Sequence, residues 1–148
     1  EEWQAKAVES GLELSIERDM TASDLWITSD KRRVRQVVTN LVSNALKYTA
    51  EGSVRLVASP SRDDFRGGVI EVSDTGIGID PAQQARIFEP YVRLKPNGLR
   101  PVEGSGLGLS IVKKLVDTLN GKVEVSSGIG LGSVFYVFLP TVSIVRAG

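Results

Sequence analysis

Asp74-Thr75-Gly76-Ile77-Gly78-Ile79 comes one residue after a mainly apolar run, residues 69–72, that has the composition of a β-strand. An acidic residue at a strand end can accept a hydrogen bond from an exocyclic amino group such as adenine N6. Gly76 and Gly78 lack the Cβ atoms that would block a flat ring, and they permit positive φ. Taken alone, Asp-Thr-Gly more often marks an ordinary strand-ending turn. The stretch therefore predicts a base-binding pocket only in combination with the features around it.

A long amphipathic helix is predicted upstream of this turn, over roughly residues 31–48, with Asp30 as its N-cap. Its apolar stripe comprises Val34, Val37, Val38, Leu41, Val42, Ala45 and Leu46. Asn40 and Asn44 are one turn apart, so they project from one face of the helix. Asparagine is a poor residue for a helix interior, and its amide oxygen suits Mg²⁺. A pair of buried amides that ties the helix to a loop explains this pattern equally well.

Two further polar residues end the same helix. Lys47 can neutralise phosphate charge, and Tyr48 can pack against a base or a ribose. A solvated lysine and a tyrosine at the edge of the core are equally consistent with their positions.

A second glycine cluster, Gly104-Ser105-Gly106-Leu107-Gly108-Leu109, leads into a predicted helix over 107–119. Free N–H groups at a helix N-terminus can bind phosphate. The cluster is no Walker loop, because Leu109 and Ser110 follow Gly108, and it has no preceding strand as a Rossmann fingerprint requires. Residues 92–106 contain prolines and glycines without a clear period, which predicts a mobile lid. Arg93 could reach a terminal phosphate.

The remaining segments complete an α+β pattern. A helix is expected over 1–10, with Trp3, Ala7 and Val8 at helical intervals, and a short helix from the Asp80 cap to about Phe88. Strands are expected at 12–16, near 25–28, and at 54–57, 69–72, 122–126 and 134–139, with a polar hairpin loop over 59–68 and a tail over 141–148. The pattern predicts one domain, residues 1–148, with helices packed on one face of a mixed, largely antiparallel sheet.

Composition narrows the function. The chain has 148 residues, of which 41% are hydrophobic and 24% charged, as in an ordinary globular domain. Eighteen basic residues balance eighteen acidic ones, which disfavours a nucleic-acid partner or direct membrane contact. The sequence has no cysteine, which fits a reducing compartment. It has no histidine either, so this chain cannot hold phosphate on a histidine of its own.

The order of these motifs resembles that of the catalytic, ATP-binding domain of bacterial sensor histidine kinases. The paired asparagines, the 74–79 turn, Ile87-Phe88-Glu89-Pro90-Tyr91, the stretch from Gly104 to Val112 and the stretch 132–135 are similar to the family's N, G1, F and G2 boxes and to a later glycine motif. The resemblance covers residues 11 to 140. It implies the Bergerat fold, an α/β sandwich shared with gyrase, a mismatch-repair ATPase and a heat-shock chaperone.

The resemblance also implies roles for single residues. Asn44 would coordinate Mg²⁺, with Asn40 in the same box and Lys47 on the phosphates. Asp74 would bind adenine N6, flanked by Gly76, Ile77, Gly78 and Ile79, and Ser133 would support the carboxylate through hydrogen bonds. Tyr48 and Tyr91 would line the nucleotide, although the family usually has phenylalanine at the second of these positions. Further contacts would come from Gly104, Ser105, Gly106, Leu107, Gly108 and Leu109, and Arg93 would act on the terminal phosphate.

The expected function is to bind Mg-ATP and pass its γ-phosphoryl group to a histidine on another domain. That domain would be the dimerisation domain of the same parent protein, upstream of a response-regulator receiver domain. The family's histidine-bearing hairpin is missing here, which suggests a catalytic domain cut from a larger protein. We expect it to lie in the cytoplasm, whether or not the parent is membrane-attached. The alternatives are a gyrase-type ATPase, a nucleotide-binding scaffold without catalysis and, less fittingly, a serine-kinase anti-sigma factor.

Overall fold

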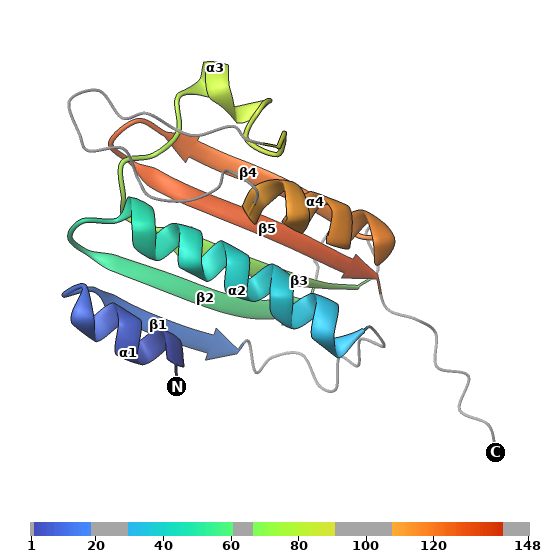
Figure 1. Ribbon diagram of the computed structural model, residues 1–148, viewed down its shortest axis with the longest axis horizontal. Coiled ribbons are helices and arrows are strands. Elements are labelled where there is room, and N and C mark those ends of the chain that lie inside the picture. Colours follow the sequence, from blue (N-terminus) through green and yellow to red (C-terminus); the bar gives the residue numbers. More distant parts are fainter. Residues whose placement is uncertain (1, 19–29, 61–66, 91–107, 141–148) are drawn as a thin grey trace.

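A computed structural model of the chain describes residues 2–18, 30–60, 67–90 and 108–140. Its elements are, in chain order, α1 (Glu2–Glu9), β1 (Glu13–Arg18), α2 (Lys31–Tyr48), β2 (Ser53–Pro60), β3 (Gly67–Asp74), α3 (Pro81–Gln84), α4 (Gly108–Thr118), β4 (Lys122–Gly128) and β5 (Gly132–Pro140). Figure 1 shows α1, α2 and α4 side by side on one face of the sheet, while α3 lies at one end, near the β4–β5 turn.

The five strands form one sheet in the order β1-β2-β3-β5-β4. Strand β1 runs parallel to β2, and the other three pairs are antiparallel. The sheet is therefore mixed and largely antiparallel, with the helices on one face, as the sequence predicted. Because β3 and β5 are neighbours, the end of β3 lies beside the start of β5, and the candidate site forms there.

Helix α2 covers the middle of the sheet. Asp30 caps it as predicted, because its carboxylate accepts hydrogen bonds from the backbone N–H groups of Arg32 and Arg33. The predicted apolar stripe faces inward. Four of its members are buried and three are partly buried against them: Val37, Leu41, Val42 and Ala45 in the first group, and Val34, Val38 and Leu46 in the second.

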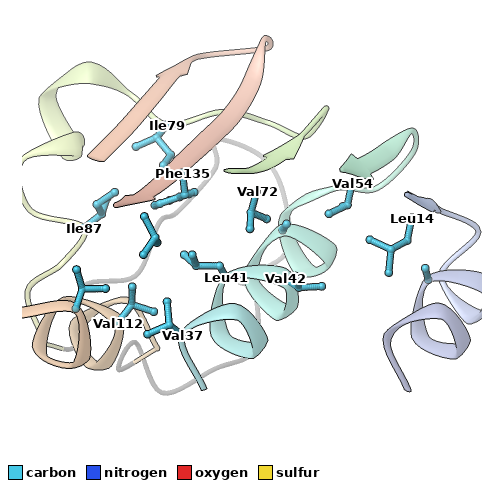
Figure 2. Packing of buried hydrophobic residues seen from close by; sticks show 14 of the residues in the cluster. Leu14, Val37, Leu41, Val42, Val54, Val72, Ile79, Ile87, Val112 and Phe135 are labelled. Carbon is cyan, nitrogen blue, oxygen red and sulfur yellow. The ribbon is translucent and has the colours of Figure 1, made fainter. Parts of the chain in front are cut away.

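The core fills the layer between the helices and the sheet. Figure 2 shows Val37 of α2 close to Val112 of α4, and Leu41 beside them pointing toward the sheet. Val72 of β3 and Phe135 of β5 are directly paired across the strands and are both buried. Strand residues of this face alternate with outward-facing polar residues, such as Arg55 and Glu17, whose side chains form an ion pair across β1 and β2.

Three expectations differ from the structure. The short helix after Asp80 ends at Gln84, and single turns follow it through Glu89; these turns bring Ile87 into the core. Val8 is 76% exposed, because it lies five residues after Trp3 and so falls beside the inward stripe that contains Ala7. Strands β2 and β3 also extend into the predicted hairpin loop, to Pro60 and from Gly67.

Other predicted segments lie outside the described residues. These are the strand near 25–28, the lid over 92–106 and the tail over 141–148. The helix predicted over 107–119 is present as α4, whose described part begins at Gly108.

Candidate functional site

Three polar side chains lie in a row where β3 ends and β5 begins. Asp74 of β3 is paired with Ser133 of β5, and Ser133 is paired with Ser127 of β4. Directly paired residues of neighbouring strands project from the same face of a sheet. On this face the row continues the line of core residues, so an otherwise apolar layer becomes polar at one end.

Asp74 is partly buried in that row. Burial raises the pKa of its carboxyl above the usual range, and the backbone N–H groups of Gly76 and Ser133 partly offset this by hydrogen bonding to the charged form. The bond from Gly76 N to Asp74 Oδ1 is 2.9 Å long. A carboxylate held this way keeps acceptor capacity for a further donor.

The glycines of the 74–79 turn are required by neighbouring backbone. A Cβ added to Gly76 would lie 2.3 Å from the carbonyl oxygen of Tyr48, and one added to Gly78 would lie 1.9 Å from that of Gly128. Gly78 also has a φ of +74°, which disfavours any other residue. The sequence predicted that these glycines leave room for a flat ring and permit positive φ, and the φ of Gly78 agrees with the second of these. The structure adds a second reason for glycine at these positions: neighbouring backbone carbonyl oxygens leave no room for a Cβ atom.

Hydrogen bonds hold the same turn from both sides. The N–H of Ile77 donates to the carbonyl oxygen of Tyr48 at 3.3 Å, and the N–H of Gly130 donates to the carbonyl oxygen of Ile77 at 2.8 Å. The turn is thus fixed between the C-terminal end of α2 and the β4–β5 turn, beside Asp74.

Ser127 and Gln84 provide further support. Ser127 Oγ accepts a hydrogen bond from the N–H of Ile79 at 2.8 Å. Gln84 Nε2 donates to the carbonyl oxygens of Ile79 and Ser127, at 3.1 and 3.0 Å. The end of the turn is therefore tied to β4 and to α3.

An open cavity adjoins Asp74, with residues of α2 on one side and Leu109 of α4 on another. Its lining mixes polar and apolar side chains: Asn44, Ala45, Tyr48, Asp74, Gly78, Ile79, Leu109, Ser133 and Phe135. A flat apolar group with one amino substituent would match a cavity whose polar wall carries a carboxylate.

The two asparagines of α2 are placed differently. Asn44 lines the cavity. Asn40, one turn earlier, is not among the lining residues, and its Nδ2 is buried with no hydrogen-bond partner in the described part of the chain. An unsatisfied buried donor costs about 1–3 kcal/mol, so an acceptor supplied from outside would stabilise this arrangement. Lys47 is exposed at the end of the same helix.

Seven of the predicted site residues therefore meet around one cavity: Asn44, Tyr48, Asp74, Gly78, Ile79, Leu109 and Ser133. Five others lie outside its lining: Asn40, Lys47, Gly76, Ile77 and Gly108. The remaining six are outside the described residues: Tyr91, Arg93, Gly104, Ser105, Gly106 and Leu107.

Sequence reasoning missed Ser127, Gln84, Ala45 and Phe135. The sequence carried a signal for the first of these. Val123 and Val125 set the inward register of β4, so the residue two further on also points inward, and a serine there breaks an apolar series. The predicted strand ended at residue 126, one position before Ser127 and two before the end of β4.

Comparison with known proteins agrees with this geometry. Residues 29–143 match the family model described as histidine kinase-, DNA gyrase B-, and HSP90-like ATPase. The chain belongs to this family. The predicted fold and the predicted family are thereby confirmed.

Curated relatives place the chain within the sensor-kinase branch. It is 45% identical over 135 residues to the autoinducer 2 sensor kinase/phosphatase LuxQ of Vibrio parahaemolyticus, covering 88% of this chain and 15% of the relative. It is 44% identical over 114 residues to the sensor protein TorS of Escherichia coli, covering 77% of this chain and 12% of that protein. The chain thus spans less than one sixth of the length of either relative.

Solved structures of histidine kinases share the fold of this chain. Full-length ShkA in complex with AMPPNP superposes with a TM-score of 0.75 at 32% identity, covering 97% of this chain and 29% of that one. The catalytic domain of the histidine kinase ThkA superposes with a TM-score of 0.75 at 27% identity, covering 94% of this chain and 86% of that domain. In the described part of this chain, no helix is both long and apolar enough to cross a membrane.

Proposed function

We propose that this chain binds Mg-ATP in the cavity beside Asp74 and donates the γ-phosphoryl group to a histidine on a separate domain. The observation that carries the proposal is the joint placement of Asp74 and Asn44 on one cavity, between α2, α4 and the end of β3. Asp74 would accept from the amino group of adenine, and Ile79 and Phe135 would contact the ring. Small-molecule sites commonly combine an apolar wall with a few convergent polar groups.

The α2 amides fit a magnesium–phosphate group. Asn44 Oδ1 is a hard oxygen ligand, and Mg²⁺ takes its other ligands from phosphates and water. The described residues contain no cluster of three or more acidic side chains, cysteines or histidines that would hold a metal without such help. The buried Nδ2 of Asn40 would donate to a phosphate oxygen. When bound, Mg²⁺ would neutralise charge on the transferring group.

The nucleophile must come from another domain. This chain has no histidine. In the transfer, an imidazole nitrogen of the partner attacks the γ-phosphorus, the bond from that phosphorus to the β,γ-bridging oxygen breaks, and ADP leaves. Phosphoryl transfer of this kind depends mainly on positioning and charge neutralisation. The histidine would belong to the dimerisation domain of the parent protein, and a receiver domain would accept the phosphoryl group next. Since ATP is the donor, the domain would work in the cytoplasm.

An independent ATPase is the second candidate, and the family includes such enzymes. Water-activating members of this fold would need a carboxylate at the position of Asn40. A neutral amide takes no proton at neutral pH. We therefore expect negligible hydrolysis by this chain alone.

The test is transfer of label from [γ-³²P]ATP. The chain is incubated with Mg²⁺, labelled ATP and the parent's histidine-bearing dimerisation domain as a separate polypeptide. We expect acid-labile label on the second polypeptide, lost with Asn44→Ala and kept with Gln36→Ala, an exposed position on the same helix. Release of inorganic phosphate at the same rate without the partner would instead show an ATPase.

A further inference from the structure

Ser127 lies behind the cavity rather than in its lining. It is the third member of the polar row, paired with Ser133, and its Oγ is 2.8 Å from Ser133 Oγ. Ser133 and Asp74 line the cavity, whereas Ser127 does not and contacts the lining residues Ser133 and Ile79 from behind. The mechanism above gives Ser127 no part beyond support of the turn.

The hydrogen bonds around Ser127 determine which hydroxyl donates to which. Ser127 Oγ has one hydrogen and is 2.8 Å from the carbonyl oxygen of Gly132, which can only accept. That hydrogen therefore belongs to the bond with Gly132. Ser127 Oγ accepts from the N–H of Ile79 at 2.8 Å. In the remaining contact, Ser133 must donate to Ser127.

This assignment decides what Ser133 offers to a ligand. Its only hydrogen points away from the cavity, toward Ser127, so its remaining capacity is that of an acceptor. Asp74, paired with it on β3, is an acceptor as well when ionised. The polar wall of the cavity thus presents two acceptors side by side.

We propose that Ser127 sets the base selectivity of the nucleotide pocket by fixing the Ser133 hydroxyl as an acceptor. The inference rests on the proposed nucleotide function. Two adjacent acceptors favour an exocyclic amino group, as in adenine. They disfavour a base with a carbonyl oxygen at the same ring position, as in hypoxanthine or guanine, because acceptor then faces acceptor. Ser127 is a positioning residue that acts through Ser133.

Removing the Ser127 hydroxyl should change selectivity more than affinity. In Ser127→Ala the Ser133 hydrogen is free to rotate toward the cavity and donate to a carbonyl oxygen. We expect the ratio of the Kd for IDP to the Kd for ADP to fall about tenfold. This is the usual effect of replacing one acceptor–acceptor contact by a hydrogen bond. A purely structural loss would weaken both nucleotides equally and leave the ratio unchanged.

The experiment is calorimetric titration of the full chain with ADP and with IDP, in the presence of Mg²⁺. Ser126→Ala is the matched control, because Ser126 is the neighbouring residue of the same strand and points to the opposite, exposed side. Ser127→Thr keeps a hydroxyl and should restore the wild-type ratio. Thermal melting of each variant checks that it is folded.

The outcomes separate the two proposals. A lower ratio in Ser127→Ala, with wild-type ratios in Ser126→Ala and Ser127→Thr, supports the inference. Normal ADP binding with an unchanged ratio in Ser127→Ala overturns the inference alone. A wild-type chain that binds neither nucleotide overturns the proposed function and the inference with it. If Ser127→Ala does not fold, Ser133→Ala replaces it, and an unchanged ratio in that variant refutes the role of the Ser133 hydroxyl.

Discussion

Asp74→Asn should weaken nucleotide binding while stabilising the empty protein. The substitution keeps the shape of the side chain and replaces a charged acceptor by a neutral amide. Asn can still accept the hydrogen bond from Gly76, which is 2.9 Å long in the wild type. Its amide nitrogen then takes the place of the second carboxylate oxygen, where a donor would meet the donor of the adenine amino group.

The expected loss of affinity follows from one hydrogen bond to a charged group. Such a bond contributes about 1.5–3 kcal/mol, which corresponds to a Kd for ADP that is roughly 10- to 150-fold higher. Calorimetric titration of the wild type and the variant with ADP measures this ratio directly.

The effect on stability has the opposite sign. Burial raises the pKa of Asp74 in the folded chain above its unfolded value, and the two backbone donors offset this only in part. The contribution of this carboxyl to stability is therefore fully present below the unfolded pKa and is lost as pH rises through the folded pKa. At neutral pH the ionised group disfavours folding, so the neutral amide should raise Tm. In acid, where the wild-type carboxyl is protonated, the advantage should disappear.

Melting curves of nucleotide-free wild type and Asp74→Asn at neutral and acid pH test this reasoning. A variant that melts lower than wild type at neutral pH would refute the role assigned to burial. Unchanged ADP affinity in a well-folded variant would refute the role assigned to the carboxylate.

Three other perturbations separate packing from binding. Gly78→Ala should destabilise the chain more than Gly130→Ala in urea unfolding. Both positions have φ near +75°, where a residue with a side chain costs about 1–2 kcal/mol of backbone strain. Only the Cβ added at Gly78 would also strike a backbone oxygen, at 1.9 Å. Leu41→Ala, at a side chain that is 1% exposed, should lower the free energy of unfolding by about 2–5 kcal/mol, whereas Leu131→Ala, at 85% exposure, should change it by less than about 0.5 kcal/mol. Asn44→Ala should make the Kd for a non-hydrolysable ATP analogue nearly independent of Mg²⁺, and titration with and without the metal measures this.

Much of the fold could be predicted because its signals are local. The apolar stripe of α2 keeps a helical period from Val34 to Leu46, and Asp30 is a strong cap, so both the helix and its inward face were predicted correctly. The end of α3 could not be predicted in the same way. The chain leaves the helix after Gln84 so that Ile87 can enter the core, and tertiary packing of this kind overrides local propensity.

The site was predictable as a set of motifs but not as a set of contacts. Asp74 and Asn44 were identified from residue type and spacing, and both line the cavity. The alternation of β4 signals that Ser127 points inward, but its bond to Ile79 depends on how the 74–79 turn packs against β4. The contacts of Gln84 depend likewise on where α3 lies relative to β4, which no local pattern encodes. The same is true of the glycines, because the carbonyl oxygens that exclude a side chain there come from α2 and from the β4–β5 turn.

The location of the nucleotide is the central claim, and an NMR titration tests it most directly. Backbone amide signals of the ¹⁵N-labelled chain are followed as ADP and Mg²⁺ are added. The account predicts saturable shifts at Gly78, Ile79 and Ser133, which line the cavity, and none at Glu17 or Arg55, which form an ion pair on the far side of the sheet. A folded chain that shows no shifts, or shifts confined to another surface, would contradict it.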